Sequence, residues 1–176
     1  MFVALQEVSK ILVPVDGSKS SVAAAEAAIK LAKRYNSPVI RSRTKVTARP
    51  SVEVIALYVV DVSPRLELFG KFGFDYAARE KDALEQARKV TRGWFSQIKK
   101  KADANNVAFR SEVRDNSLSS VVGEIIDFAE RENVDVIVVG TRGQSEYKKL
   151  LMGSVSSALV TYAPCTIIIV RNKGKS

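Results

Sequence analysis

Histidine is absent from this chain of 176 residues, and cysteine occurs once, as Cys165. Without histidine the chain cannot form a serine–histidine or cysteine–histidine nucleophile, or a metal site with imidazole ligands. A single cysteine forms no disulfide within the chain and excludes cysteine-rich zinc sites. Any catalysis would therefore depend on carboxylates, lysines or a bound metal–nucleotide complex.

Hydrophobic runs long enough to cross a membrane are also missing. Apolar stretches such as 136–139 and 167–170 are far shorter than the roughly 20 residues that a membrane-spanning helix needs. The opening residues are apolar, but they have no basic lead and no small-residue cleavage site, so they do not predict a secretory signal. Together with the single cysteine, these features predict a soluble, cytoplasmic protein with no membrane partner.

The composition is that of a folded domain. Hydrophobic residues make up 46% of the chain and charged residues 27%, which excludes a wholly disordered or collagen-like protein. The length predicts a single domain over residues 1–176.

The excess of positive charge is local. The chain carries 28 Lys and Arg against 19 Asp and Glu, a net charge of +9. Between Ala27 and Val52 no acid interrupts the cations, which are Lys30, Lys33, Arg34, Arg41, Arg43, Lys45 and Arg49. The charge therefore describes one segment and not the whole surface.

Short β-branched runs alternate with longer segments of helical period, which is typical of an α/β fold with a parallel sheet. The pattern predicts five strands, over 10–15, 52–60, 107–113, 134–139 and 165–170. It predicts helices over 18–34, 77–102, 117–132 and 154–162. With right-handed crossovers these elements form an open, Rossmann-like five-stranded parallel sheet of order 3-2-1-4-5 with helices on both faces.

The spacing of apolar residues predicts which side of each helix packs on the sheet. The inward residues of the first helix are Val22, Ala25, Ile29 and Ala32. Those of the second are Leu84, Ala87, Val90, Trp94 and Ile98. Those of the third are Val121, Val122, Ile125, Phe128 and Ala129.

A doubly wound sheet binds its ligand at the carboxyl ends of the strands, where the winding direction reverses. This rule selects the loops after Val15 and Val139. The second loop has the pattern Gly140-x-x-Gly143-x9-Gly153-Ser154 and ends at the start of a helix. Glycines let main-chain amides approach an anion, and a helix N-terminus adds unpaired N–H groups and a positive dipole end. The pattern therefore predicts a phosphate site.

Each of these residues taken alone has a simpler explanation. Gly140 is also explained by a chain turn, Ser154 by a helix cap and Ser156 by an ordinary surface position. Asp16, which precedes Gly17 and Ser18, is equally explained as a cap on the helix that follows. The combination of glycines and hydroxyls at fixed intervals, directly after a buried strand, favours the phosphate site.

Three stretches of the chain resemble universal stress proteins. They are KILVPVDGS at 10–18, EVIALYVV at 53–60 and VDVIVVGTRGQSEYKKLLMGSVSSALVTYAPCTIIIVR at 134–171. The glycine pattern is similar to that of the family's ATP-binding branch, whereas the branch without the pattern does not bind ATP. The resemblance implies a fold like that of the adenine nucleotide alpha hydrolases and a bound ATP, AMP or other adenine nucleotide, with or without Mg²⁺ or Mn²⁺.

The resemblance also implies a role for each matching position. Asp16 would accept hydrogen bonds from the ribose hydroxyls. Pro14 and Val15 would lie against the adenine, and the main chain of Val59 would meet its edge. The positions that match the phosphate-contacting ones are Gly140, Arg142, Gly143, Gly153, Ser154 and Ser156, with Thr141, Gln144, Ser145 and Val155 beside them.

Hydrolysis of a bound nucleotide has little support in the sequence. The Walker signature GxxxxGK[ST] is absent, and no base is recognisable beside the phosphate loop. Glu146 would repel a polyphosphate unless it faces solvent or shares a metal, although Lys148 and Lys149 offset its charge. We expect no catalytic and no metal-ligating residues, and at most a slow ATPase.

Two segments differ from the pattern around them. The segment 36–51 is basic, contains proline and is longer than the short turn usual in the family. It is interpreted as a solvated insertion or an extra hairpin, in preference to an electrostatic contact for an acidic protein, nucleic acid or an anionic membrane face. Its lack of aromatic residues disfavours single-strand binding. The segment 63–76 combines three phenylalanines with Pro64 and two glycines and is predicted to be a flexible loop.

The last predicted strand, Cys165 to Val170, would leave an apolar sheet edge exposed in a monomer. Pairing with its own copy across a two-fold axis would cover that edge, and the resemblance implies the same homodimer. The leading hypothesis is thus an ATP-binding, dimeric regulatory switch with an unknown protein partner. The alternative is an interaction module in which the glycine loop is structural and the basic segment 36–51 binds the partner.

Overall fold

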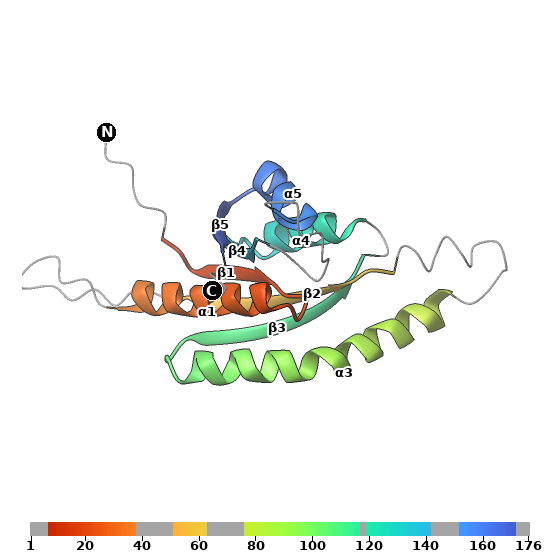
Figure 1. The fold of residues 1–176 in the computed structure, drawn as a ribbon, viewed down its shortest axis with the longest axis horizontal. Coiled ribbons are helices and arrows are strands. Elements are labelled where there is room, and N and C mark those ends of the chain that lie inside the picture. Colours follow the sequence, from red (N-terminus) through yellow and green to blue (C-terminus); the bar gives the residue numbers. More distant parts are fainter. Residues whose placement is uncertain (1–6, 38–50, 63–75, 117–118, 142–151, 172–176) are drawn as a thin grey trace, which may run out of the picture.

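The computed structural model describes residues 7–37, 51–62, 76–116, 119–141 and 152–171. Within these ranges a five-stranded parallel sheet of order β3-β2-β1-β4-β5 lies between two layers of helices (Figure 1). The strands are β1 (Lys10–Pro14), β2 (Glu53–Val60), β3 (Ala108–Asp115), β4 (Val136–Gly140) and β5 (Thr166–Val170). The described helices are α1 (Lys19–Asn36), α3 (Tyr76–Asp103), α4 (Val121–Arg131) and α5 (Ser154–Tyr162). The predicted fold class and strand order are confirmed.

The two central strands are buried on both faces. Every residue of β4 is buried, and the middle of β1, Ile11 to Val13, has no exposed surface. Continuous apolar runs of this kind are what a parallel strand covered on both faces requires. The chain winds from β1 outward to β3 and then returns across the sheet to β4, so the winding direction reverses between β1 and β4.

Helices α1 and α3 cover one face of the sheet, and α4 and α5 cover the other (Figure 1). α1 packs through small side chains, with Ile29 as the one large buried residue among Ala24, Ala25, Ala28 and Ala32. It begins at Lys19 because Ser18 caps it, its hydroxyl accepting a hydrogen bond from the amide of Ser21 at 3.1 Å.

The end of α1 is tied to the start of β2. The side-chain oxygen of Asn36, the last residue of α1, accepts a hydrogen bond from the amide of Val52 at 2.8 Å. Val52 directly precedes β2. The two ends of the basic segment 36–51 are therefore held together.

The buried stripe of α3 differs from the predicted one. Val90 was predicted to face the sheet, but 59% of its surface is exposed, so this prediction was wrong. Its neighbour Thr91 is buried instead, between Ala87 and Ile98. The hydroxyl of Thr91 donates to the carbonyl of Ala87 at 2.8 Å, so its only side-chain donor is already paired when the residue is buried. Periodicity counted Thr91 as polar and missed this internal bond.

The opposite face is built around Phe128 of α4. Phe128 is 1% exposed and packs in one cluster with Leu12, Ile55, Ile137 and other buried residues from β1, β2 and β4. α4 begins later than predicted because its cap is Ser120, whose hydroxyl accepts from the amide of Gly123 at 3.0 Å.

Arg110 on β3 is the centre of an ionic cluster near the amino ends of the strands. Its guanidinium lies 2.8 Å from Glu132, 3.2 Å from Glu112 and 3.5 Å from Glu53, and Glu132 also pairs with Lys10 at 3.1 Å. Hydrogen bonds from Lys10 and Arg110 hold the pKa of Glu132 below its ordinary value. The cluster links the first three strands to the end of α4.

The carboxylate of Asp135 organises the amino end of β1. One of its oxygens accepts hydrogen bonds from the amide of Ser9 at 2.8 Å, the hydroxyl of Ser9 at 2.9 Å and the amide of Lys10 at 3.0 Å. Burial is the largest influence and acts to raise the pKa of Asp135, but the hydrogen bonds together outweigh it and hold this pKa below its ordinary value. The ionised form therefore stabilises the folded chain.

We expect Asp135→Asn to lower the free energy of unfolding by about 1–3 kcal/mol at neutral pH, because three partly buried donors lose a charged acceptor. The folded-state pKa lies below the unfolded value of about 3.9, so the stabilisation is fully present above that value. It is lost as the pH falls through the folded-state pKa. Urea unfolding at a series of pH values measures this difference between wild type and variant.

The control for this experiment is Asp127→Asn, because Asp127 is exposed on α4. We expect the control to change stability by less than about 0.5 kcal/mol. A difference between wild type and Asp135→Asn that stays constant down to about pH 3 would contradict the role of the ionised carboxylate.

Candidate functional site

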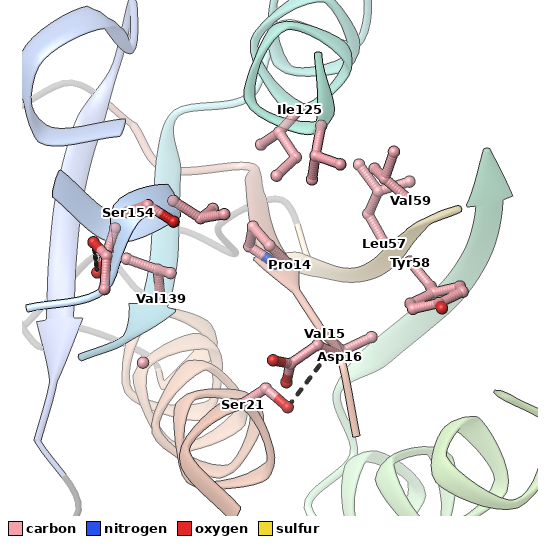
Figure 2. Close-up of a pocket in the computed structure, with 15 residues that line it drawn as sticks. Pro14, Val15, Asp16, Ser21, Leu57, Tyr58, Val59, Ile125, Val139 and Ser154 are labelled. Carbon is pink, nitrogen blue, oxygen red and sulfur yellow. Dashed lines mark hydrogen bonds between the residues drawn. The ribbon is translucent and has the colours of Figure 1, made fainter. Parts of the chain in front are cut away.

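A cavity of about 230 Å³ opens at the carboxyl ends of the central strands, where the winding direction reverses. Its walls come from the ends of β1, β2 and β4 and from the amino-terminal parts of α1, α4 and α5 (Figure 2). Nine of the predicted site residues line it: Pro14, Val15, Asp16, Val59, Gly140, Gly153, Ser154, Val155 and Ser156. The structure therefore brings together, at one cavity, residues that the sequence places in three separate stretches.

The cavity exists because β1 and β4 separate before they end. Their paired register stops at Leu12 and Ile137, although β4 continues for three further residues. The amide of Asp135 donates to the carbonyl of Lys10 at 3.1 Å, so the main-chain groups of Lys10 face β4. Main-chain groups alternate between the two neighbouring strands, and those of Leu12 and Pro14 therefore face β4 as well. Pro14 has no N–H and cannot extend this ladder. The two strand ends leave a gap that the lining residues surround.

One part of the cavity wall is apolar and another is polar. Figure 2 shows Ile125 and Val59 near Pro14, with Leu57 on the same strand as Val59. Asp16, just after the end of β1, and Ser154, at the start of α5, lie away from Ile125. The cavity can thus accept a ligand with one flat apolar end and one polar or anionic end.

Asp16 stands in the turn that connects β1 to α1. Its main chain follows Val15, whose amide donates to the carbonyl of Leu57 at 2.8 Å. One carboxylate oxygen of Asp16 accepts from the amide of Ser18 at 3.0 Å. The cap of α1 is Ser18, so the alternative in which Asp16 itself caps the helix is wrong. A carboxylate has several lone pairs, so Asp16 can accept further hydrogen bonds while it holds this turn.

Val59 lies on β2 beyond the end of β1. Main-chain bonds from Glu53 to Ser9 and from Val15 to Leu57 show that the odd-numbered residues of β2 face β1. Among the described residues, the Val15–Leu57 bond is the last between these two segments. The amide and carbonyl of Val59, next in the series, therefore border the cavity with no β1 partner.

α5 begins at the cavity without a side-chain cap. Its N-cap is Gly153, whereas α1 and α4 are capped by Ser18 and Ser120. Ser154 and Val155, at the start of the helix, both line the cavity. Within the described part of the chain their amides have no acceptor, so the first turn presents donors and the positive end of the helix dipole.

The start of α5 is fixed against the end of β4. The amide of Gly153 donates to the carbonyl of Thr141 at 2.8 Å. The hydroxyl of Ser156, which is 2% exposed, donates to the carbonyl of Gly153 at 3.0 Å. Thr141 thus contributes through its carbonyl and does not line the cavity, unlike the other described site residues. Ser156 is buried, so the surface explanation of this residue is wrong.

Gly140 is required by a close approach between two elements. A Cβ atom there would lie 2.6 Å from the hydroxyl oxygen of Ser20 and 2.8 Å from its main-chain carbon and oxygen. Ser20 is in the first turn of α1, which crosses the end of β4 at this point. Glycine is therefore needed here for packing, whether or not a ligand binds.

Several predictions fall on residues that the structure does not describe. Arg142, Gly143, Gln144 and Ser145 lie outside the described residues, as do 38–50 of the basic segment and 63–75 of the predicted loop. Among the described residues no group of three or more His, Cys, Asp and Glu side chains could hold a metal ion. None of the described helices is long and apolar enough to cross a membrane.

Sequence reasoning missed part of the cavity wall. The additional lining residues are Ser21, Leu57, Tyr58, Val121, Ile125 and Val139. Tyr58 and Val139 had a usable signal, because each directly precedes a residue already selected, Val59 and Gly140. Val121 and Ile125 come from α4, which the sequence placed on the sheet without indicating that its first turn reaches the cavity.

Comparison with known proteins agrees with this architecture. The sequence model described as the universal stress protein family matches residues 7–41 and 44–171. A universal stress protein of Methanocaldococcus jannaschii is 30% identical over 168 residues, which cover 94% of this chain and 84% of that protein.

Two solved structures share the fold at low sequence identity. A universal stress protein crystallised in complex with cAMP has a TM-score of 0.63 at 18% identity, and the match covers 93% of this chain and 97% of that one. A universal stress protein family protein of Arabidopsis thaliana with AMP bound has a TM-score of 0.50 at 16% identity, with coverage of 94% and 93%.

We expect Gly140→Ala to lower the free energy of unfolding by about 1–3 kcal/mol, because the added methyl meets the main chain of Ser20. Gly93→Ala is the matched control. Gly93 lies in α3, and no described atom outside its own stretch of helix comes within 4 Å of its Cβ position. Alanine there should stabilise the chain by about 0.5–1 kcal/mol. Denaturant unfolding measures both, and equal effects would contradict the packing role of Gly140.

Proposed function

The chain belongs to the universal stress protein family, and from that premise we propose that it binds an adenine nucleotide, specifically ATP, between the ends of β1 and β4. The observation that carries the proposal is the convergence, at one cavity, of a carboxylate, an uncapped helix start and an apolar wall. A nucleotide has the complementary parts: sugar hydroxyls, phosphates and a flat base. The solved relatives with cAMP and AMP support the same ligand class.

The apolar part of the cavity suits the base. Pro14, Val59 and Ile125 provide apolar surface around a flat ring. The amide and carbonyl of Val59 provide one donor and one acceptor at the ring edge. Adenine offers an acceptor at N1 and a donor at its N6 amino group, whereas guanine offers a donor at N1 and an acceptor at O6. The same main-chain pair therefore favours adenine over guanine.

Asp16 suits the sugar. A carboxylate is an acceptor of hydrogen bonds, and a ribose presents two neighbouring hydroxyl donors. The oxygen of Asp16 that holds the amide of Ser18 fixes the orientation of the carboxylate. Asp16 is therefore oriented before the ligand arrives, which lowers the entropy lost on binding.

The start of α5 suits the phosphates. The amides of Ser154 and Val155 and the positive helix end attract an anion. In our proposal Arg142, Gly143, Gln144 and Ser145 complete the phosphate contacts, since they continue from Thr141 at the end of β4. A divalent cation such as Mg²⁺ or Mn²⁺ would enter with the phosphates, because Asp16 is the one carboxylate among the described cavity residues. Hydrolysis is not part of the proposal.

We expect titration calorimetry with ATP to give saturable binding to the wild type. Asp16→Ala should weaken the affinity tenfold or more, because a charged hydrogen bond contributes about 1.5–3 kcal/mol. Asp127→Ala is the matched control: it removes the same charge from the exposed side of α4 and should change the affinity by less than about twofold. GTP should bind at least about tenfold more weakly than ATP.

Absence of heat with millimolar adenine nucleotides would contradict the proposal. The interaction module with the basic segment 36–51 would then be favoured, and neutralising Arg41, Arg43 and Lys45 should abolish partner binding. Equal affinity of wild type and Asp16→Ala for ATP would contradict the position assigned to the sugar.

We further propose that the chain acts as a homodimer paired through β5. β5 is the edge strand next to β4, and it exposes 38% of Ile169. Helix α5, which packs on β5, exposes 51% of Val160 and 70% of Tyr162. An apolar edge of this kind is covered most simply by its own copy across a two-fold axis.

Helix α5 would connect the nucleotide to the dimer surface. Its first residues line the cavity, and its last residues include the exposed Tyr162. A nucleotide that contacts Ser154 therefore acts on a rigid element that ends at the proposed interface. In this proposal occupancy of the cavity changes which surface the dimer offers to a protein partner, as in a nucleotide-dependent switch.

We expect Ile169→Lys to convert the dimer to a monomer, because a charged side chain at the sheet edge opposes strand pairing. Sedimentation at micromolar concentration measures the mass. Val90→Lys is the matched control: it places the same charge on an exposed apolar residue of α3 and should leave the mass unchanged. A monomeric wild type, or an Ile169→Lys variant that remains dimeric, would contradict the proposed interface.

A further inference from the structure

We propose that Trp94 of α3 is a positioning residue for Asp16, because its indole backs the turn that carries the carboxylate. The inference rests on the proposed function, since it concerns how the cavity holds the sugar of a nucleotide. Trp94 does not line the cavity, and it is the single tryptophan of the chain.

The indole occupies the space beside Gly17, the residue that follows Asp16. A Cβ atom at Gly17 would lie 2.2, 2.5 and 2.6 Å from Cζ2, Cε2 and Cη2 of Trp94. Gly17 also has a φ of +78°, a backbone conformation that side chains disfavour. Glycine is therefore required at this position, because the backbone conformation and the neighbouring ring both exclude a side chain.

The same indole contacts the second strand of the cavity. The rings of Trp94 and Tyr58 meet edge to face, with centroids 5.8 Å apart and an interplanar angle of 77°. Figure 2 shows the Tyr58 ring directed away from Ile125, so it lies on the α3 side of β2. Trp94 thus fills the corner between the β1 turn and the end of β2.

Buried residues of α3 on either side of Trp94 fix the position of the indole. Thr91 is 1% exposed and Ile98 is 3% exposed, on the turns before and after Trp94. The helix is therefore anchored to the sheet on both sides of the ring. A ring fixed in this way limits how far the turn at Gly17 can move away from the cavity. It therefore also limits the movement of Asp16, the residue before Gly17.

This role predicts an effect of Trp94 on the preference for ribose over 2′-deoxyribose. Asp16 distinguishes ribose from 2′-deoxyribose only if its carboxylate stays within hydrogen-bonding distance of the 2′-hydroxyl. Loss of general packing weakens ATP and 2′-deoxy-ATP to the same degree. Loss of the support behind Asp16 weakens ATP more than 2′-deoxy-ATP and reduces the ratio of the two affinities.

The experiment measures this ratio by titration calorimetry with ATP and 2′-deoxy-ATP. The wild type should prefer ATP by about tenfold, the value of one hydrogen bond to a charged group. Trp94→Ala should reduce the preference to about twofold or less, and Trp94→Phe, which keeps an aromatic ring in the corner, should restore most of it.

Ile98→Ala is the matched control, because it removes a buried side chain one turn further along α3 without touching the Gly17 turn. It should lower thermal stability and keep the wild-type preference for ATP. If Trp94→Ala does not fold, Trp94→Leu takes its place: it keeps apolar volume in the corner without a ring and should also reduce the preference for ATP, whereas an unchanged preference would overturn the positioning role. Emission of the single tryptophan should change more on saturation with ATP than with 2′-deoxy-ATP.

The possible failures are distinguishable. A wild type that binds no adenine nucleotide would overturn the proposed function itself. A wild type that binds ATP, together with a Trp94→Ala variant that keeps the tenfold preference, would overturn only the positioning role. Unchanged emission on binding would also overturn only the positioning role. A wild type that binds ATP and 2′-deoxy-ATP equally would overturn both the positioning role and the contact of Asp16 with the 2′-hydroxyl.

Discussion

The candidate site depends on the missing N–H of Pro14, which stops the hydrogen bonding between β1 and β4 before the strands end. Pro14 occupies a β4-facing position of β1 but has no N–H, and pairing between the two central strands ends at Leu12 and Ile137. Beyond that point the chain leaves β1 through the Asp16 turn, and β4 continues to the packing contact at Gly140. The cavity, its carboxylate and its uncapped helix all lie around this early separation.

The two ends of the sheet use their polar groups differently. At the amino ends, Arg110, Glu132 and Lys10 satisfy one another, and Asp135 holds the first amides of β1. At the carboxyl ends, the main chain of Val59 and the first turn of α5 keep unused hydrogen-bonding capacity among the described residues. The groups that stabilise the fold and those that line the candidate site are therefore separated along the strands, which lets the site remain polar without weakening the core.

Much of this architecture could be predicted from the sequence because it depends on local patterns. β-branched runs indicated every described strand, and the glycine pattern with Asp16 indicated the end of the sheet at which the cavity lies. The packing reasons were out of reach because they join distant residues: Gly140 with Ser20, and Gly17 with Trp94. Thr91 was misjudged because its internal hydrogen bond lets a polar residue take the place predicted for Val90.

The hydrogen bond between Asn36 and Val52 gives the chain a place where its length can change at little cost. Because both attachment points are already held together by the fold, extra residues between them change only the entropy of closing a loop, about 0.6 kcal/mol for each doubling of length. Foreign peptides, affinity tags or whole inserted domains could be accommodated there while the opposite end of the sheet stays intact.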